Sequence, residues 1–151
     1  MTRTRENVCS TLGFEKLLLA TDGSEFAEAA IHEAINIAKV CSSKLFIISV
    51  VEFNAEYAAL APKLIDKAEN ETKEHLESVK EKITKEGLEC DIIIHQGEEA
   101  YKFIVDEARQ RKADMIVMGS HGRTGLKRLM MGSVTSRVIG HAPCKVLVVP
   151  C

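Results

Sequence analysis

A segment rich in glycine and basic residues, GSHGRTGLKRLMMGSV, follows the apolar run ADMIVM in this chain of 151 residues. Glycine lets the backbone approach a ligand closely and adopt unusual dihedral angles. The basic side chains either neutralise an anion or form a solvated loop face. The combination predicts a loop laid around something negatively charged. The residues that carry this prediction are Gly119, Gly122, Gly125, Gly132, Arg123, Lys127 and Arg128.

The loop leads into a short helix, predicted from about Ser133 to Gly140. The amides of Gly132, Ser133 and Val134 would then lie at a helix N-terminus and point at an anion such as phosphate. The hydroxyls of Ser133 and Thr135 add donors. The competing interpretation is a plain connection in which Ser133 only caps the helix. The length of the loop favours phosphate, since such connections usually take about 2–6 residues.

The glycine spacing differs from two common phosphate-binding motifs. The chain contains no G-x-x-x-x-G-K-[ST] sequence, which excludes a Walker P-loop. It contains no G-x-G, and the loop follows the fourth apolar run, which excludes the dinucleotide fingerprint of a first strand. What remains is Gly119-x2-Gly122-x9-Gly132-Ser133.

Five short apolar runs predict the strands that must position this loop. They are continuous rather than alternating, which is typical of strands covered on both faces. Helical patterns separate the first four, so we expect an α/β fold with an open five-stranded parallel sheet and helices on both faces. The runs are KLLLA from Lys16, KLFIISVV from Lys44, CDIIIH from Cys90, DMIVMG from Asp114 and KVLVV from Lys145.

Ligands bind such sheets beyond the carboxyl ends of the strands, where the strand order reverses. The loops of interest are therefore TDGS after the first strand, VVE after the second, and the glycine loop. In the helix that follows TDGS, Asp22 and Ser24 are alternative caps. A long helix in the middle of the chain is expected to begin near Pro62 and to stop at Gly87. Its buried stripe is predicted as Leu64, Ile65, Ala68, Leu76, Val79 and Ile83.

Residues 14–150 are similar to the universal stress protein family. The resemblance rests on the glycine spacing, on TDGS after the first strand, on GSHG opening the loop, and on the ending GSVTSRVIGHAPCKVLVVP. It implies a Rossmann-like, adenine nucleotide-binding fold, a cytoplasmic homodimer, and bound ATP in members that carry the glycine motif. We expect Mg²⁺ or Mn²⁺ to bridge the phosphates, with no metal ligand from the protein.

The resemblance also implies roles for single residues. Asp22 would hold the ribose or the adenine edge, Ala20 and Thr21 would line the base, and the backbone of Val50 would meet adenine. Met118 would pack on the base side. Related ATP binders often have proline where this chain has Ala20. The residues expected around the ribose and phosphates are Gly119, Ser120, Gly122, Gly132, Ser133, Val134 and Thr135.

Catalysis is less well supported than binding. Hydrolysis of ATP needs a positioned water and a group to orient it, and no base or carboxylate pair is evident near the loop. We therefore favour a nucleotide-binding regulatory or stress-response protein, with at most slow ATPase activity and no catalytic residue. One alternative is an ATP hydrolase or phosphotransferase that uses His121 or Ser133. The other is a dimeric interaction module that binds no nucleotide.

Composition and charge bear on which classes of partner the protein binds and on where in the cell it is expected. A net charge of −2 and a pI near 6.2 argue against a protein that binds nucleic acid through its overall charge. No apolar run reaches the roughly 18 residues of a membrane helix, and no apolar stretch of a secretory signal opens the chain.

Residues 1–13 are expected to be a loosely held extension, and residues 14–151 a single domain. The last strand is expected at a sheet edge, where it would pair with a second copy.

No chemical role is predicted for the five cysteines or for two of the histidines. An odd number of cysteines with no C-x-x-C pair fits neither a disulfide framework nor a zinc site. Cys41 is expected to be a small, half-buried hydrophobe. His75 and His95 are expected at the surface.

Overall fold

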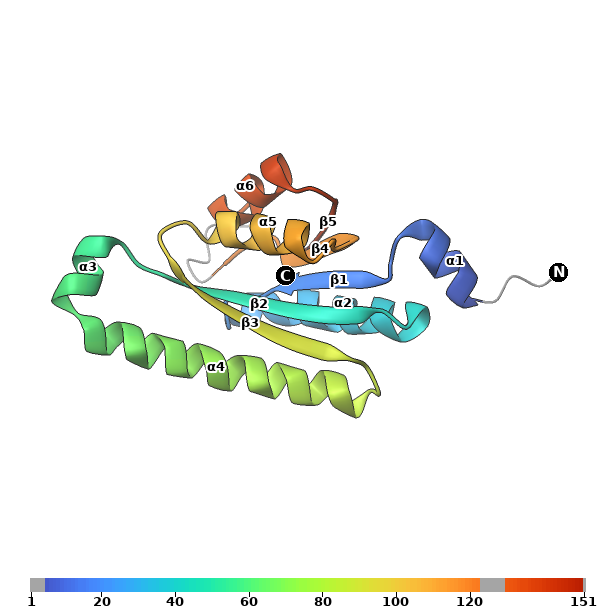
Figure 1. The fold of residues 1–151 in the computed structure, drawn as a ribbon, viewed down its shortest axis with the longest axis horizontal. Helices are drawn as coiled ribbons and strands as arrows, with labels where there is room; N and C mark the ends of the chain where they lie inside the picture. The colour runs from blue at the N-terminus through green and yellow to red at the C-terminus, as the bar shows by residue number, and fades with distance from the viewer. Residues whose placement is uncertain (1–4, 123–129, 151) are drawn as a thin grey trace.

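The computed structural model describes residues 5–122 and 130–150, and its centre is a five-stranded parallel sheet (Figure 1). The strand order is β3-β2-β1-β4-β5. The predicted open α/β sheet is thereby confirmed. The strands are β1 (Lys16–Ala20), β2 (Lys44–Glu52), β3 (Cys90–Gly97), β4 (Met115–Gly119) and β5 (Lys145–Val149).

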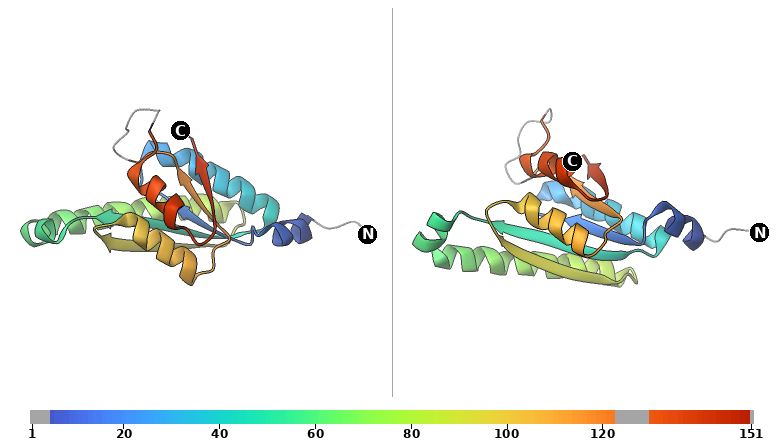
Figure 2. Two further views of the ribbon diagram at one scale, coloured as in Figure 1. Left: turned by 90° about the horizontal axis from the view of Figure 1, so that it is seen from above. Right: turned by 45° about the horizontal axis from the view of Figure 1, so that its top comes forward.

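Helices cover both faces of the sheet (Figures 1 and 2). Helices α2 and α4 pack on one face, and α5 and α6 pack on the other. A short α1 precedes the sheet, and α3 precedes α4. The helices are α1 (Arg5–Leu12), α2 (Glu28–Cys41), α3 (Ala55–Leu60), α4 (Pro62–Lys85), α5 (Ala100–Gln110) and α6 (Ser133–His141), with a 3-10 turn, η1 (Glu25–Ala27).

The central strand β1 explains why the apolar runs are continuous. Leu17 and Leu19 belong to the core under α2 and α4, whereas Leu18 belongs to the core under α5 and α6. All three are fully buried. Because successive side chains of a strand point to opposite faces, a strand with two covered faces needs apolar residues at every position.

Helix α4 agrees with its predicted bounds and differs in its buried stripe. It begins at Pro62 and ends just before Gly87, which has a φ of +76°. Leu64, predicted to be buried, is 54% exposed in the first turn. Thr72 is buried instead, and its hydroxyl donates to the carbonyl of Ala68 at 2.8 Å. The bond within the helix lets a polar residue lie in the core.

The N-terminal segment differs from the expected loose extension. Residues 5–12 form helix α1, which packs beside α2, and Cys9 is buried. A disulfide joins Cys9 to Cys41, the last residue of α2, with the two Cα atoms 5.3 Å apart. The expectation of no disulfide is therefore wrong. Their separation of 32 residues carries no pairing signal, and only the packing of α1 on α2 brings them together.

His95 is held in a polar cluster on β3 and α5 rather than lying free at the surface. Its Nε2 lies 2.8 Å from Glu107 Oε1, and Arg111 Nε donates to Glu107 Oε2 at 2.7 Å. The His95 ring also stacks on Phe103. Burial alone would raise the pKa of Glu107, but the hydrogen bonds from His95 and Arg111 outweigh it and hold that pKa below its usual range.

Replacing Glu107 should therefore destabilise the protein in a pH-dependent way. We expect Glu107→Gln to lower the free energy of unfolding by about 1–3 kcal/mol at neutral pH. A carboxylate whose pKa is depressed on folding stabilises above its unfolded pKa and loses that effect as the pH falls through the folded one. The difference from the parent should thus shrink below the ordinary value of 4.5.

Urea unfolding of both proteins between neutral and acid pH measures this. Asp106→Asn is the matched control on the same helix. Asp106 pairs with Arg109 at 3.2 Å, but both side chains are more than half exposed, so its loss should cost under about 1 kcal/mol. An equal cost for the two variants would contradict the role of the buried cluster.

Candidate functional site

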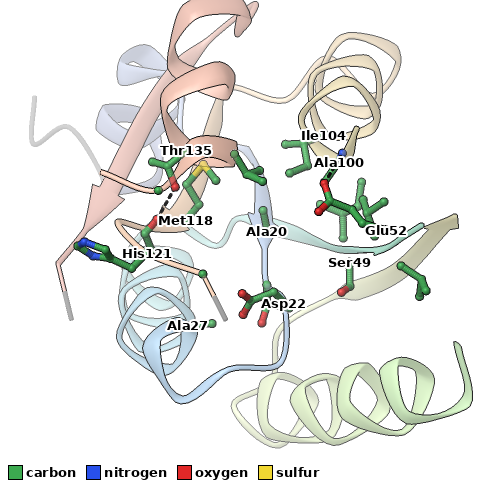
Figure 3. A pocket seen from close by; sticks show the side chains of 18 of the residues that line it. Ala20, Asp22, Ala27, Ser49, Glu52, Ala100, Ile104, Met118, His121 and Thr135 are labelled. Atoms are coloured by element: carbon green, nitrogen blue, oxygen red, sulfur yellow. Dashed lines mark hydrogen bonds between the residues drawn. The ribbon is translucent and has the colours of Figure 1, made fainter. Parts of the chain in front are cut away.

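A cavity of about 420 Å³ opens beyond the carboxyl ends of β1, β2 and β4 (Figure 3). This is the point where the strand order reverses, because β1 pairs with β2 on one side and with β4 on the other. Helices α4, α5 and α6 complete its wall. Its size falls within the usual range for small-molecule sites, roughly 300–1,000 Å³.

The structure brings together nearly all of the residues predicted for the site. Of these, only Ser120 does not line the cavity. Its amide donates to the carbonyl of Val149 at 3.1 Å, and its hydroxyl lies 2.9 Å from His121 Nδ1. The nucleotide contacts assigned to these residues stay predictions. Those that line the cavity are Ala20, Thr21, Asp22, Val50, Met118, Gly119, Gly122, Gly132, Ser133, Val134 and Thr135.

The turn after β1 holds Asp22 in a fixed orientation. One carboxylate oxygen, Oδ1, accepts hydrogen bonds from the amide of Ser24 at 2.9 Å and from its hydroxyl at 2.6 Å. Gly23 completes the turn in a left-handed backbone conformation, with a φ of +79°. Of the two predicted caps, Ser24 is the N-cap position of η1, which leads directly into α2, but its side chain makes no capping hydrogen bond, and the N-cap position of α2 itself is Ala27. Asp22 organises the turn instead, and this directs its other oxygen, Oδ2, toward Gly122.

Helix α4 reaches this turn through a contact that the sequence analysis missed. The Nε2 atom of His75 lies 3.2 Å from the hydroxyl of Thr21. The same hydroxyl accepts a hydrogen bond from the amide of Gly23 at 3.3 Å. His75 was predicted at the surface because no partner lies near it in sequence. The contact joins residues 54 positions apart.

The glycines of the loop serve close packing of the chain against itself. A Cβ at Gly132 would lie 3.3 Å from the carbonyl oxygen of Ser120, and one at Gly119 would lie 3.1 Å from that of Phe26. The φ of Gly132 is −58°, which any residue can adopt. The prediction of unusual dihedral angles is therefore wrong for Gly132, where glycine is needed because two backbone segments meet.

The N-terminus of α6 is fixed against β4 by two hydrogen bonds. The amide of Gly132 donates to the carbonyl of Ser120 at 2.8 Å, and the hydroxyl of Thr135 donates to the carbonyl of Gly119 at 2.9 Å. These donors were predicted to face phosphate, and the structure commits them to the chain itself. The amides of Ser133 and Val134 remain in the first helical turn, where amides lack partners within the helix.

The far end of the cavity contains residues to which the sequence analysis gave no role, although Glu52 belongs to the VVE segment named there. Glu52 ends β2, and its Oε1 accepts a hydrogen bond from the amide of Ala100 at 2.8 Å, which caps α5. In Figure 3 it lies at the opposite end of the cavity from His121. Position at a strand end was the available signal. The other missed residues that line the cavity include Ala27, Ser49, Ala68, Thr72, Ala100 and Ile104.

The charges around the cavity are unevenly distributed. Among the described lining residues, Asp22 and Glu52 are the acids, and His121 lies on the side of the glycine loop. Gly125, Arg123, Lys127 and Arg128, which were predicted to help hold an anion, lie outside the described residues. Within residues 5–122 and 130–150, no group of three or more His, Cys, Asp or Glu side chains is arranged to hold a metal ion. No helix in those ranges could span a membrane.

Comparison with known proteins gives a consistent result over nearly the whole chain. Residues 13–150 match the universal stress protein family. The universal stress protein MJ0531 of Methanocaldococcus jannaschii is 37% identical over 140 residues, which cover 90% of this chain and 82% of that protein.

Solved structures agree with this match. The hypothetical protein MJ0577 has a TM-score of 0.83 at 30% identity, covering 92% of this chain and 97% of that one. The universal stress protein from Archaeoglobus fulgidus, in complex with dAMP, has a TM-score of 0.69 at 24% identity, covering 91% and 98%. At that identity the second likeness shows a shared fold.

Proposed function

Because the chain belongs to the universal stress protein family, we propose that it binds ATP in the cavity beyond β1, β2 and β4. The observation that carries the proposal is the meeting of Asp22, the end of β2, the glycine loop and the N-terminus of α6 around one cavity. It acts as a regulatory or stress-response protein rather than as an efficient enzyme. The dAMP complex of a family member supports an adenine nucleotide as the ligand class.

The two ends of the cavity suit the two ends of a nucleotide. Apolar side chains, among them Ala20, Val50 and Met118, line the cavity and would pack against the base. Asp22 Oδ2 would accept a hydrogen bond from the ribose or from the adenine edge. The amides of Ser133 and Val134 would point at the phosphates from the N-terminus of α6, where the helix dipole favours an anion.

A divalent cation, Mg²⁺ or Mn²⁺, would be held through the phosphates. The described lining residues fit this arrangement, because Ser133 and Val134 place backbone amides and one hydroxyl at the start of α6. Bound there, the cation would neutralise phosphate charge. The protein would contribute the amides of α6 and the glycine backbone on the other side.

Binding is favoured over turnover because the lining acids already have structural tasks. Asp22 Oδ1 organises the turn with Ser24, and Glu52 caps α5. A hydrolase or phosphotransferase would need a group that orients or deprotonates the nucleophile. His121 and Ser133 are the candidates for that alternative. Steady-state measurement of phosphate release separates a binder from such an enzyme.

Titration calorimetry should show binding of ATP in the presence of Mg²⁺. At an ATP concentration about 100 times the dissociation constant, the folded state should gain about 2.7 kcal/mol. For a protein of this size the melting temperature should then rise by roughly 5–10 °C. CTP is the control for recognition of the base. Absence of both heat and thermal shift with ATP would contradict the proposed function.

A charge placed at the start of α6 tests the phosphate end without disturbing the loop. Ser133 is exposed, is the first residue of α6, and lines the cavity. Ser133→Asp should weaken ATP binding at least about tenfold, because its carboxylate repels phosphate. Its melting temperature should stay equal or rise, because an acid at a helix N-terminus is favourable by about 0.3–1 kcal/mol.

Ser136→Asp is the matched control for Ser133→Asp. Ser136 lies one turn further along α6, is exposed, and does not line the cavity. Its affinity should stay within about twofold of the parent, because an exposed carboxylate outside the cavity interacts with the phosphates through solvent rather than at contact distance. Calorimetry of the three proteins decides the matter. Equal affinities for the parent and Ser133→Asp would place the phosphates elsewhere.

We further propose a homodimer that forms through β5. The strand lies at one edge of the sheet and pairs only with β4 within the described chain. Its residues from Val146 to Val149 are apolar and only partly buried. An edge with unpaired backbone groups and apolar side chains invites a second strand.

Light scattering at micromolar concentrations should report a dimer for the parent. Val148→Lys should yield a monomer, because a lysine on an edge strand opposes pairing with another strand. Gln96→Lys, on β3 at the opposite edge, should leave the dimer intact. A monomeric parent would overturn the dimer, and loss of the dimer in Gln96→Lys would place the interface on the other edge.

A further inference from the structure

We propose that Cys9 and Cys41 form a thiol–disulfide exchange site, and that a small-molecule thiol acting there releases helix α1 from the body of the protein. The site lies at the end of the sheet where β1 and β2 begin, away from the cavity where they end. The inference is therefore independent of nucleotide binding.

Helix α1 is short, and Cys9 is its most buried described side chain. It contains eight residues, and isolated helices shorter than about 12–15 residues are marginal in water. Two of its apolar side chains, Val8 and Leu12, are 41% and 54% exposed, whereas Cys9 is 7% exposed. The described contact of α1 with the body of the protein is thus centred on the residue that is bonded to α2.

The chain directly after α1 has an anchor of its own in the core, in addition to the hydrogen bond that the amide of Phe14 donates to the carbonyl of Cys9 at 3.1 Å. Phe14 packs against the core under α2 and α4, and its carbonyl accepts a hydrogen bond from the hydroxyl of Ser43. Gly13, with a φ of +74°, lies between this anchor and the helix. Reduction of the disulfide would therefore free residues 5–12 and leave the start of β1 in place.

The exchange has a defined direction. Cys41 is half-buried at the end of α2, whereas Cys9 is buried, so an incoming thiolate attacks Cys41 Sγ. The S–S bond breaks, and Cys9 leaves as a thiolate that takes a proton from water. A second thiol then attacks the mixed disulfide, which leaves two protein thiols and one small-molecule disulfide. Glutathione disulfide reverses the sequence by accepting the two electrons.

The other two described cysteines are poorly suited to this chemistry. Burial raises the pKa of Cys90 to about 11, and burial also raises the pKa of Cys144. Since the thiolate is the reactive form, both stay protonated at neutral pH. Among the described cysteines, exchange is thereby directed to the Cys9–Cys41 pair.

The test compares the full chain after treatment with glutathione disulfide and after treatment with dithiothreitol, both under native conditions. Peptide mapping without reduction should find the Cys9–Cys41 cross-link in the first sample and not in the second. Hydrogen exchange of residues 5–12 should become at least about tenfold faster on reduction, while β1 and α4 are unchanged. The melting temperature should fall by several degrees, since the disulfide closes a long loop.

Two variants complete the design. Cys9→Ser with Cys41→Ser should show fast exchange of α1 under both treatments, and Cys144→Ser should respond like the parent. If the double variant does not fold, the comparison of the parent under the two treatments decides alone. The proposal is overturned if glutathione disulfide forms no cross-link, if native dithiothreitol does not reduce it, or if α1 stays protected after reduction.

Discussion

The burial of β1 on both faces and along both edges is the constraint on which the rest of the structure depends. Its leucines enter two separate cores, and its backbone pairs with β2 on one side and β4 on the other. The connection that follows β1 therefore leads toward β2 on one side, whereas the connection that follows β4 leads toward β5 on the other. The loops that follow β1 and β4 then diverge and leave a crevice between them. The cavity exists because the middle strand comes first in the chain.

The end of the cavity beside α6 is shaped by the chain's own backbone. Gly119, Gly132 and Thr135 use their backbone or hydroxyl groups to hold α6 against β4. The helix N-terminus is thus aimed by the chain's own hydrogen bonds. A preorganised group of this kind pays little reorganisation cost when an anion binds. The glycines contribute through backbone proximity more than through conformational freedom.

Much of the fold was predictable from local patterns, whereas the contacts between distant segments were not. Continuous apolar runs predicted every strand, and Pro62 and Gly87 predicted the bounds of α4, because these signals act within a few residues. Leu64 is exposed although its burial was predicted, and Thr72 is buried although no signal pointed to it, since tertiary packing decides which face of a long helix is covered. The contact of His75 with Thr21 and the pairing of Cys9 with Cys41 depend on segments brought together only by folding.

The strand order also determines when each part of the sheet can form during synthesis. β1, β2 and β3 leave the ribosome in the order in which they pair, so half of the sheet can assemble as it emerges. The other edge of β1 must wait for β4, since Lys16 bonds with Asp114, 98 residues downstream. Until then the nascent chain carries an unpaired, leucine-rich strand edge, the kind of surface that aggregates or recruits chaperones. The strand that is central in the folded sheet, β1, is therefore an edge strand until β4 has been synthesised.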